Sequence, residues 1–336
     1  MHVLLIGGTR FVGYFLTWRL LAGGHRVTLL NRGTLADPFG ERVERLHVDR
    51  RSPAFAGALA GRSFDAVVDF AAYDAADARG AVEALRGRVG HYLFISTGQV
   101  YLVRQGAPRP AREADYDGPL LPEPADPRDR DGWIYGVEKR AAEELLAAAW
   151  EEHQFPATRL RIPMVNGERD YYRRIESYLW RLLDGGPVLL PDGGTQVCRH
   201  VYGQEVARLA AGILGSPRTF GQAYNLCQQE EVTVAEAVRL LAEILGSSAP
   251  LVPIPAEQLR GAGIEPVEIS PFSGRWMSHL DPTRAQQELG FTHRPLRSYY
   301  ESIVSSFLAH PPSDRPAGYA HRATELALLQ GLGARG

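Results

Sequence analysis

Lysine is almost missing from this sequence of 336 residues: Lys139 is the only one, and the other 36 of its 37 Lys and Arg residues are arginine. Cysteine is nearly as rare, with only Cys198 and Cys227, which excludes a disulfide framework and favours a reducing, cytoplasmic setting. No stretch approaches the roughly 20 apolar residues of a membrane-spanning helix. The formal net charge is −2, so no overall positive field attracts nucleic acid.

The single lysine lies in the segment Tyr135-Gly136-Val137-Glu138-Lys139. Residues four apart share one face of a helix, and a nearby ammonium group favours the ionised form of a phenol. Lysine is a compact cation with an adjustable pKa, whereas arginine is a planar group that keeps its proton. A site that needs a small cation at a fixed depth would accept lysine and reject arginine, so Tyr135 and Lys139 are predicted to act together.

Short apolar runs alternate with helical patterns through the first half of the chain. Strands are expected at residues 3–6, 26–30, 43–48, 66–70, 91–96 and 158–162, and helices at 11–22, 75–88 and 133–153. This alternation predicts an α/β fold with a Rossmann-type doubly wound parallel sheet. The expected domain organisation is a dinucleotide-binding domain over 1–166 to which about 222–246 returns, a smaller substrate-binding region over 167–310, and a peripheral tail over 311–336.

A glycine-rich segment, Gly7-Gly8-Thr9-Arg10-Phe11-Val12-Gly13, directly follows the first expected strand. Glycines let the backbone approach a pyrophosphate, and the start of the next helix supplies N–H groups and a partial positive charge. The sequence therefore predicts a dinucleotide cofactor at this turn. The expected contacts are Gly7, Thr9, Arg10, Phe11, Val12 and Gly13.

Together, the glycine segment and the Tyr135–Lys139 motif resemble the extended short-chain dehydrogenase/reductase superfamily, in its NAD-dependent epimerase/dehydratase branch. The resemblance runs from residue 1 to about residue 308. It implies further cofactor contacts after the third strand and on a ledge of small residues after the fourth, namely Asp49, Arg50, Phe70, Ala71 and Ala72.

The resemblance also implies an enzyme that transfers hydride at a secondary alcohol or ketone. Tyr135 would be the acid/base, since a cation one helical turn away lowers the pKa of a phenol from its usual value near 10. Lys139 would be that cation and would hold the nicotinamide ribose. By its spacing to Val100-Tyr101, the catalytic hydroxyl would belong to Thr97 rather than Ser96. The expected substrate contacts are Thr97, Gln99, Arg199 and His200.

The choice of cofactor is predicted from the residues around its adenosine ribose. Sites selective for NAD place a carboxylate at the end of the second strand, where this chain has Asn31 followed by Arg32. Arg10 lies inside the glycine segment. Two arginines without a carboxylate favour a 2′-phosphate, so NADP(H) is the favoured cofactor and NAD(H) the alternative.

Two departures from the family pattern fall in the expected substrate region. Met164 occupies a place where the family often has an asparagine, and Cys198 occupies the place of a phosphate-binding arginine, with Arg199 shifted by one residue. The substrate is therefore expected to be a small molecule, a sugar nucleotide or a related anionic compound, but the chain does not resemble a standard UDP-galactose epimerase. Reductase, epimerase and dehydratase chemistry stay open.

A rival function comes from the same fold, because the glycine segment with Asn31-Arg32-Gly33 resembles an atypical subgroup that includes chloroplast stem-loop RNA-binding proteins. Arginines beside aromatic residues can bind phosphates and stack on bases, and such a cluster occurs here, formed by Arg169, Tyr171, Tyr172, Arg173 and Arg174. The negative net charge and the presence of Tyr135, Lys139 and Thr97 argue against this non-catalytic alternative.

The assembly state and the metal content are also predicted. The family often pairs two helices from each subunit, which here are those over 75–88 and 133–153, so a homodimer is expected. None of the ten histidines lies in a His-x-x-x-His spacing with a carboxylate, and no metal is expected.

Overall fold

The computed structural model describes residues 1–333, and they form two compact units. The first unit contains Met1–Pro163, Val201–Cys227 and Ser278–His293. The second contains Met164–His200, Gln228–Met277 and the segment from Arg294. Among the described residues, no helix is both long and apolar enough to cross a membrane.

The first unit is built on one parallel sheet of seven strands in the order β11-β6-β5-β4-β1-β2-β3. This order confirms the predicted doubly wound fold, because the strand order reverses beside β1, where such sheets bind dinucleotides. The strands are β1 (His2–Ile6), β2 (Arg26–Asn31), β3 (Val43–His47), β4 (Ala66–Asp69), β5 (Tyr92–Thr97), β6 (Ala157–Ile162) and β11 (Ala223–Asn225).

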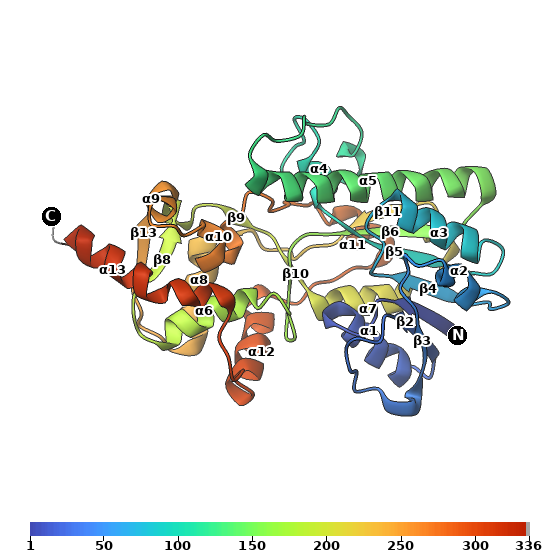
Figure 1. The fold of residues 1–336 in the computed structure, drawn as a ribbon, viewed down its shortest axis with the longest axis horizontal. Helices are drawn as coiled ribbons and strands as arrows, with labels where there is room; N and C mark the ends of the chain where they lie inside the picture. The colour runs from blue at the N-terminus through green and yellow to red at the C-terminus, as the bar shows by residue number, and fades with distance from the viewer. Residues whose placement is uncertain (334–336) are drawn as a thin grey trace. The chain divides into compact units, whose positions relative to one another are not determined.

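Helices cover both faces of this sheet (Figure 1). One face carries α3 (Ala75–Leu85) packed on α5 (Pro127–His153), and the other carries α1 (Phe11–Ala22) packed on α7 (Gly203–Ile213). Helix α5 begins earlier than the sequence pattern predicts, because the Asp126 side chain accepts from the N–H of Arg128 and Pro127 fits the first turn. The other helices are α2 (Ala54–Leu59), α4 (Gln99–Leu102) and α11 (Thr283–Leu289).

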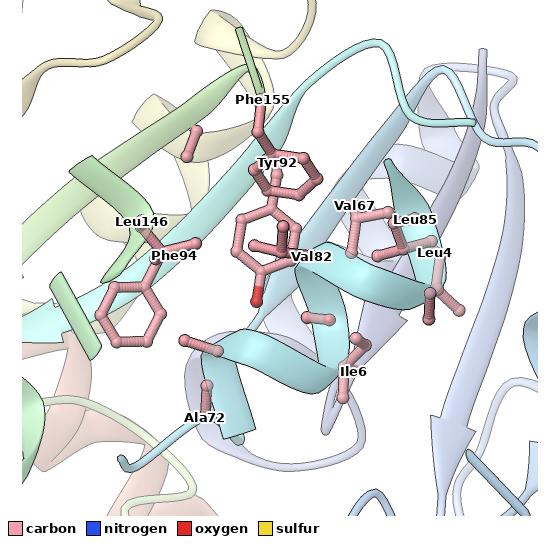
Figure 2. Packing of buried hydrophobic residues seen from close by; sticks show 14 of the residues in the cluster. Leu4, Ile6, Val67, Ala72, Val82, Leu85, Tyr92, Phe94, Leu146 and Phe155 are labelled. Atoms are coloured by element: carbon pink, nitrogen blue, oxygen red, sulfur yellow. The ribbon is translucent and has the colours of Figure 1, made fainter. Parts of the chain in front are cut away.

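An apolar core lies between the sheet and helices α3 and α5. Figure 2 shows Tyr92 packed beside Phe155, with its hydroxyl pointing away from that ring. The two ring centroids are 5.3 Å apart. Tyr92 is fully buried, so its hydroxyl needs a polar partner inside the protein, and this partner is described with the site below.

The helices of the second unit are α6 (Arg174–Leu183), α8 (Val234–Leu245), α9 (Ala256–Gly261), α10 (Pro266–Ile269), α12 (Leu296–Ala309) and α13 (Arg322–Gly333). Its strands form two pairs. Strand β8 (Val188–Pro191) runs parallel to β13 (Leu251–Ile254), and β9 (Val197–Cys198) runs antiparallel to β12 (Val232–Thr233). Strands β7 (Val165–Asn166) and β10 (Val201–Tyr202) belong to the second and first unit, respectively.

The two units differ from the expected domain organisation in two places. Of the segment 222–246, only β11 joins the large sheet, whereas α8 packs on α6 and α12 of the second unit. The tail after residue 311 was expected to be peripheral, but Glu325 is fully buried and pairs with Arg181 of α6 at 2.6 Å. The sequence gave no signal that Glu325 is buried, because charged residues near the end of a chain are usually exposed.

Candidate active site

The glycine segment forms the turn between β1 and α1. Gly7 has a φ of +86°, and a Cβ atom there would lie 3.2 Å from the Cβ of Ala71, so the turn lies against the predicted ledge. A Cβ on Gly13 would lie 2.7 Å from the Cα of Gly8. The Thr17 hydroxyl accordingly reaches the Gly8 and Gly13 carbonyl oxygens, at 3.1 and 2.8 Å. This close packing leaves room for backbone alone, as a pyrophosphate cradle requires.

Arg10 is the N-cap residue of α1 and its side chain is exposed. Phe11 follows with a φ of 45°, a left-handed conformation that is unfavourable for a residue with a side chain and is typical of functional turns. The first turn of α1 holds no acidic residue, so the partial positive charge of the helix start is available to an anion.

The end of β2 carries no carboxylate at the position that NAD-selective sites use. The Asn31 side chain accepts from the N–H of Gly33 at 2.8 Å, which fixes the turn, and Arg32 between them is exposed. Asp49, after β3, also closes a local turn, because its carboxylate accepts from the N–H of Arg51 at 2.9 Å.

The ledge after β4 is held by a carboxylate that the sequence prediction missed. Asp69 is fully buried, and one of its oxygens accepts from the backbone N–H groups of Ala71 and Ala72 at 2.8 and 2.9 Å. The Tyr92 hydroxyl donates to the other oxygen at 2.6 Å. Phe70 and Ala71 remain partly exposed. The position of Asp69 at the end of an apolar strand was the only signal in the sequence.

Arg50 lies against the same carboxylate. Its guanidinium donates to Asp69 at 2.7 Å and to the carbonyl oxygen of Asp77 at 2.5 Å, and the side chain is only 7 % exposed. The neighbouring anion raises the pKa of Arg50, although its burial alone would lower that pKa. The structure thus gives Arg50 internal partners and places it where it supports the ledge.

Lys139 is buried at the carboxyl ends of β4 and β5. Its ammonium group donates to the carbonyl oxygens of Ala72 and Ile95, both at 2.8 Å, and lies 4.4 Å from the centre of the Phe94 ring. The lysine side chain is almost completely buried, and this desolvation lowers its pKa to about 8. A guanidinium fork would not fit this pair of carbonyl oxygens in the space of an ammonium.

Tyr135 lies one turn before Lys139 on α5 and is partly exposed. Its ring centroid is 6.4 Å from that of the exposed Tyr73, next to the ledge. Gly136 lies between Tyr135 and Lys139 in the sequence. A side chain does not fit at this position, because a Cβ there would lie 2.6 Å from Val103. Helix α5 can therefore approach α4 closely.

Ser96 and Thr97 end β5 and have different surroundings. The Ser96 hydroxyl is buried and donates to Glu143, which forms a buried ion pair with Arg161 at 2.6 Å. Thr97 is partly exposed, and its hydroxyl accepts from the N–H of Gln99 at 3.2 Å. Of the two hydroxyls, that of Ser96 is thus bound to a buried carboxylate, and that of Thr97 belongs to a partly exposed residue. The Gln99 amide donates to the Gly132 carbonyl oxygen at 2.6 Å.

A cavity of about 190 Å³ opens beside α4 in the same unit, lined among others by Arg104, Arg109, Ser278 and His279. Arg104 donates to two neutral acceptors, the carbonyl oxygens of Asp117 and Gly106. Its positive charge therefore has no carboxylate partner among the described residues.

The other two expected substrate residues lie in the second unit. Arg199 donates to the Gln228 carbonyl oxygen at 3.1 Å and pairs with Glu231 at 2.9 Å. His200 is buried, contacts the Asn166 amide at 2.9 Å, and has its pKa lowered to about 3 by desolvation. Both are held by internal contacts of that unit. Among the described residues, no cluster of three or more His, Cys, Asp or Glu side chains could hold a metal ion.

Comparison of the sequence with models of known protein families identifies the family of this chain. Residues 3–86 and 80–227 match the model of the NAD dependent epimerase/dehydratase family. The chain belongs to this family. The resemblance predicted from the Tyr135–Lys139 motif and the glycine turn is thereby confirmed, and a nicotinamide cofactor is supported for this family member.

Two curated relatives are each 26 % identical to this chain. One is the chloroplast stem-loop binding protein of 41 kDa b of Arabidopsis thaliana, matched over 263 residues, which are 74 % of this chain and 64 % of that protein. The chain thus spans less than two thirds of that relative. The other is the 2'-dehydrokanamycin reductase of Streptomyces kanamyceticus, matched over 306 residues, which are 90 % of this chain and 80 % of that protein.

Solved structures show the same fold. UDP-glucose 4-epimerase of Thermotoga maritima, solved with UDP-glucose, superposes with a TM-score of 0.73 at 20 % identity and covers 92 % of this chain and 99 % of its own. The dTDP-glucose 4,6-dehydratase of Bacillus anthracis, solved with NAD, gives 0.72 at 15 % identity over 93 % and 97 %.

Proposed function

We propose that this protein is an NADP(H)-dependent enzyme that transfers hydride reversibly at a secondary alcohol or ketone, with Tyr135 as its acid/base. The observation that carries the proposal is the position of Lys139. The only lysine of the chain is buried between two carbonyl oxygens at the carboxyl ends of β4 and β5, one helical turn from Tyr135. The reaction is either a net reduction or a step of an epimerisation or dehydration.

The chain's own residues would move and hold the proton of the reacting oxygen. The phenol of Tyr135 gives or takes that proton, and the Lys139 ammonium stabilises its ionised form. The Thr97 hydroxyl can both donate and accept, so it orients the reacting oxygen. When bound, the nicotinamide ring supplies or accepts the hydride.

The glycine turn and the ledge have the form that a dinucleotide needs. Gly7 and Gly13 leave no space for side chains, and the uncompensated start of α1 suits a pyrophosphate. Lys139 would hold the nicotinamide ribose, and Ala71 and Ala72 would line the dinucleotide. Asp49 would lie at the adenine.

The preference for NADP(H) rests on Arg10 and Arg32, which are exposed beside a strand end without a carboxylate. To test it, the protein is purified and denatured, any released nucleotide is identified, and the emptied protein is titrated with NADPH and NADH. We expect NADPH to bind more tightly and Arg32→Gln to reduce that preference by about tenfold, whereas the control Arg19→Gln, at the far end of α1, leaves it unchanged. Equal binding of both cofactors contradicts the preference.

The same experiment separates the reaction types. Tightly retained dinucleotide supports epimerase or dehydratase chemistry, in which the hydride returns to the substrate, and exchangeable cofactor supports a reductase.

The uncompensated charge of Arg104 in the cavity beside α4 favours an anionic substrate, such as a sugar nucleotide or a related compound.

A second candidate function is nucleotide or RNA binding without catalysis. Tyr171 and Tyr172 are exposed with ring centroids 4.4 Å apart, and the guanidinium of Arg174 lies 4.2 Å from the Tyr172 ring. Such surfaces stack on bases, and one relative is named as a stem-loop binding protein. If neither NADPH nor NADH binds while a stem-loop RNA does, this function replaces the enzyme.

We also propose a homodimer through α3 and α5, the helices that the family resemblance implies, in a cytoplasmic setting. Light scattering at micromolar concentration tests it, and a monomeric mass rejects it.

A further inference from the structure

The carboxylate of Asp69 receives hydrogen bonds from four different donors. They are the backbone N–H groups of Ala71 and Ala72, the hydroxyl of Tyr92 and the guanidinium of Arg50. The carbonyl group of Ala72 in turn accepts from the Lys139 ammonium at 2.8 Å. The backbone of Ala72 therefore connects a buried ion pair on its N–H side with the only lysine on its carbonyl side.

We propose that Asp69 is a positioning residue of the active site, which fixes the ledge against Lys139 and supplies the negative charge that keeps the lysine in its ammonium form. This inference rests on the proposed function only in assigning Lys139 to the cofactor site. Arg50 has the opposite electrostatic effect on the lysine, because it partly neutralises Asp69. Arg50, Asp69 and Tyr92 thus form a support beneath the ledge instead of a cofactor contact.

The geometry of the ledge supports this role. An anion at the end of a strand could be held by one hydrogen bond, but here two consecutive N–H groups converge on one carboxylate oxygen. That bonding fixes the backbone on the N-terminal side of the Ala72 Cα. The Ala72 carbonyl oxygen, which meets the lysine, belongs to the next peptide group, whose Tyr73 N–H donates to Asp77 at 2.9 Å, so the ledge backbone is held on both sides of Ala72. Figure 2 shows Ala72 and the Tyr92 hydroxyl in the same core cluster, and buried hydrogen bonds and charges are weakly screened.

Charged groups act on Lys139 from β4, α3, α5 and the segment after β3, while β5 presents only Phe94 and the Ile95 carbonyl oxygen to it. Asp69 at the end of β4, Glu143 one turn further along α5, and Asp77 of α3 all raise its pKa, whereas Arg50 and above all the burial of the ammonium lower it. Glu143 is already paired with Arg161. Asp69 has the largest of the effects that oppose desolvation, so changes at its ion pair should be detected at the lysine.

The single lysine allows a direct test without cofactor or substrate. Protein labelled with 13C-lysine gives one Cε signal, whose pH titration reports Lys139 alone. We expect Asp69→Asn to move the midpoint down by about one pH unit, and Arg50→Gln to move it up. Opposite shifts from the two ends of one ion pair distinguish the proposal from general loosening, which would move both variants in the same direction.

Arg62→Gln is the matched control, because it breaks the Arg62–Glu44 ion pair of 2.6 Å in the same unit and should leave the midpoint unchanged. Circular dichroism checks the fold of each variant. An unchanged midpoint in folded Asp69→Asn, or shifts of the same sign in both variants, overturns the proposal. If only one variant folds, the direction in which its titration midpoint moves decides between the two outcomes.

If neither variant folds, Tyr92→Phe provides the test, because it keeps both charges and removes one donor from Asp69. The proposal then predicts an NADPH dissociation constant about threefold higher than in the wild type, and an unchanged constant overturns it. Failure of the proposed function looks different: the wild-type protein would not bind NADPH, while the lysine titration would still respond to Asp69→Asn.

Discussion

The two units bury similar arginine–carboxylate pairs in different surroundings. In the first unit, Arg50–Asp69 lies at the end of β4, where the carboxylate also binds backbone N–H groups beside the predicted site. In the second unit, Arg181–Glu325 joins α6 to α13, and Arg181 also donates to the Ser177 and Gly318 carbonyl oxygens. Burial and pairing are thus common to both. What distinguishes Arg50–Asp69 from the Arg181–Glu325 clamp is its position at the carboxyl ends of parallel strands, beside the predicted site.

Tyr135→Phe should produce the largest effect and should be confined to the chemistry. Loss of an acid/base lowers turnover by about 10²–10⁴-fold, while the NADPH dissociation constant stays near that of the wild type because the glycine turn, the ledge and Lys139 are intact. Steady-state kinetics and NADPH fluorescence measure the two quantities. The control is Tyr73→Phe, whose exposed ring is the neighbour of Tyr135, and full activity of Tyr135→Phe contradicts the mechanism.

Breaking the clamp of the second unit should reduce stability. Glu325→Gln leaves Arg181 buried without its anion, which costs about 3–5 kcal/mol of the free energy of unfolding. In contrast, Glu243→Gln breaks the exposed Arg297–Glu243 pair, and we expect a cost of about 0–1 kcal/mol. Urea unfolding followed by circular dichroism compares them, and equal losses would show that the buried pair is no clamp.

Ser96 and Thr97 allow the same comparison within one strand. Thr97→Val should lower turnover by about tenfold with little change in stability, since it removes a partly exposed hydroxyl that we assign to the substrate. Ser96→Ala should instead lower the free energy of unfolding by about 1–3 kcal/mol, because buried Glu143 loses a donor. If Ser96→Ala proves to be the variant that loses turnover at full stability, the assignment is reversed.

The smallest effects concern pH. As the pH rises above about 8, kcat/KM should fall while the contribution of Lys139 to the free energy of unfolding should rise. The pKa of Lys139 is lowered from 10.5 to about 8 by burial, so kcat/KM should fall as the pH rises through about 8 and the ammonium is lost. Between that value and 10.5 the unfolded chain binds more protons at this lysine than the folded chain, so this group makes stability rise with pH. Lys139→Met should lack this rise of the free energy of unfolding with pH, measured by urea unfolding. A wild-type protein that also lacks the rise contradicts the lowered pKa of Lys139.

The fold could be predicted from the sequence because alternating strand and helix patterns and the glycine turn are local signals. The pairing of Tyr135 with Lys139 was also local, at four residues on one helix. Asp69 and Tyr92 were missed because their contact joins residues far apart in the chain, and an aspartate at a strand end looks like an ordinary turn residue. The buried role of Glu325 was missed because its partner Arg181 lies on a distant helix.

The central claim is that the only lysine of the chain belongs to a nicotinamide cofactor site. The most direct measurement adds NADPH to the 13C-lysine-labelled wild-type protein and follows the single Cε signal. The account predicts a saturable displacement of this signal, reached at a lower concentration with NADPH than with NADH, and the same binding curve by fluorescence. NADPH binding that leaves the signal of Lys139 unmoved, or no binding of either cofactor, would contradict it.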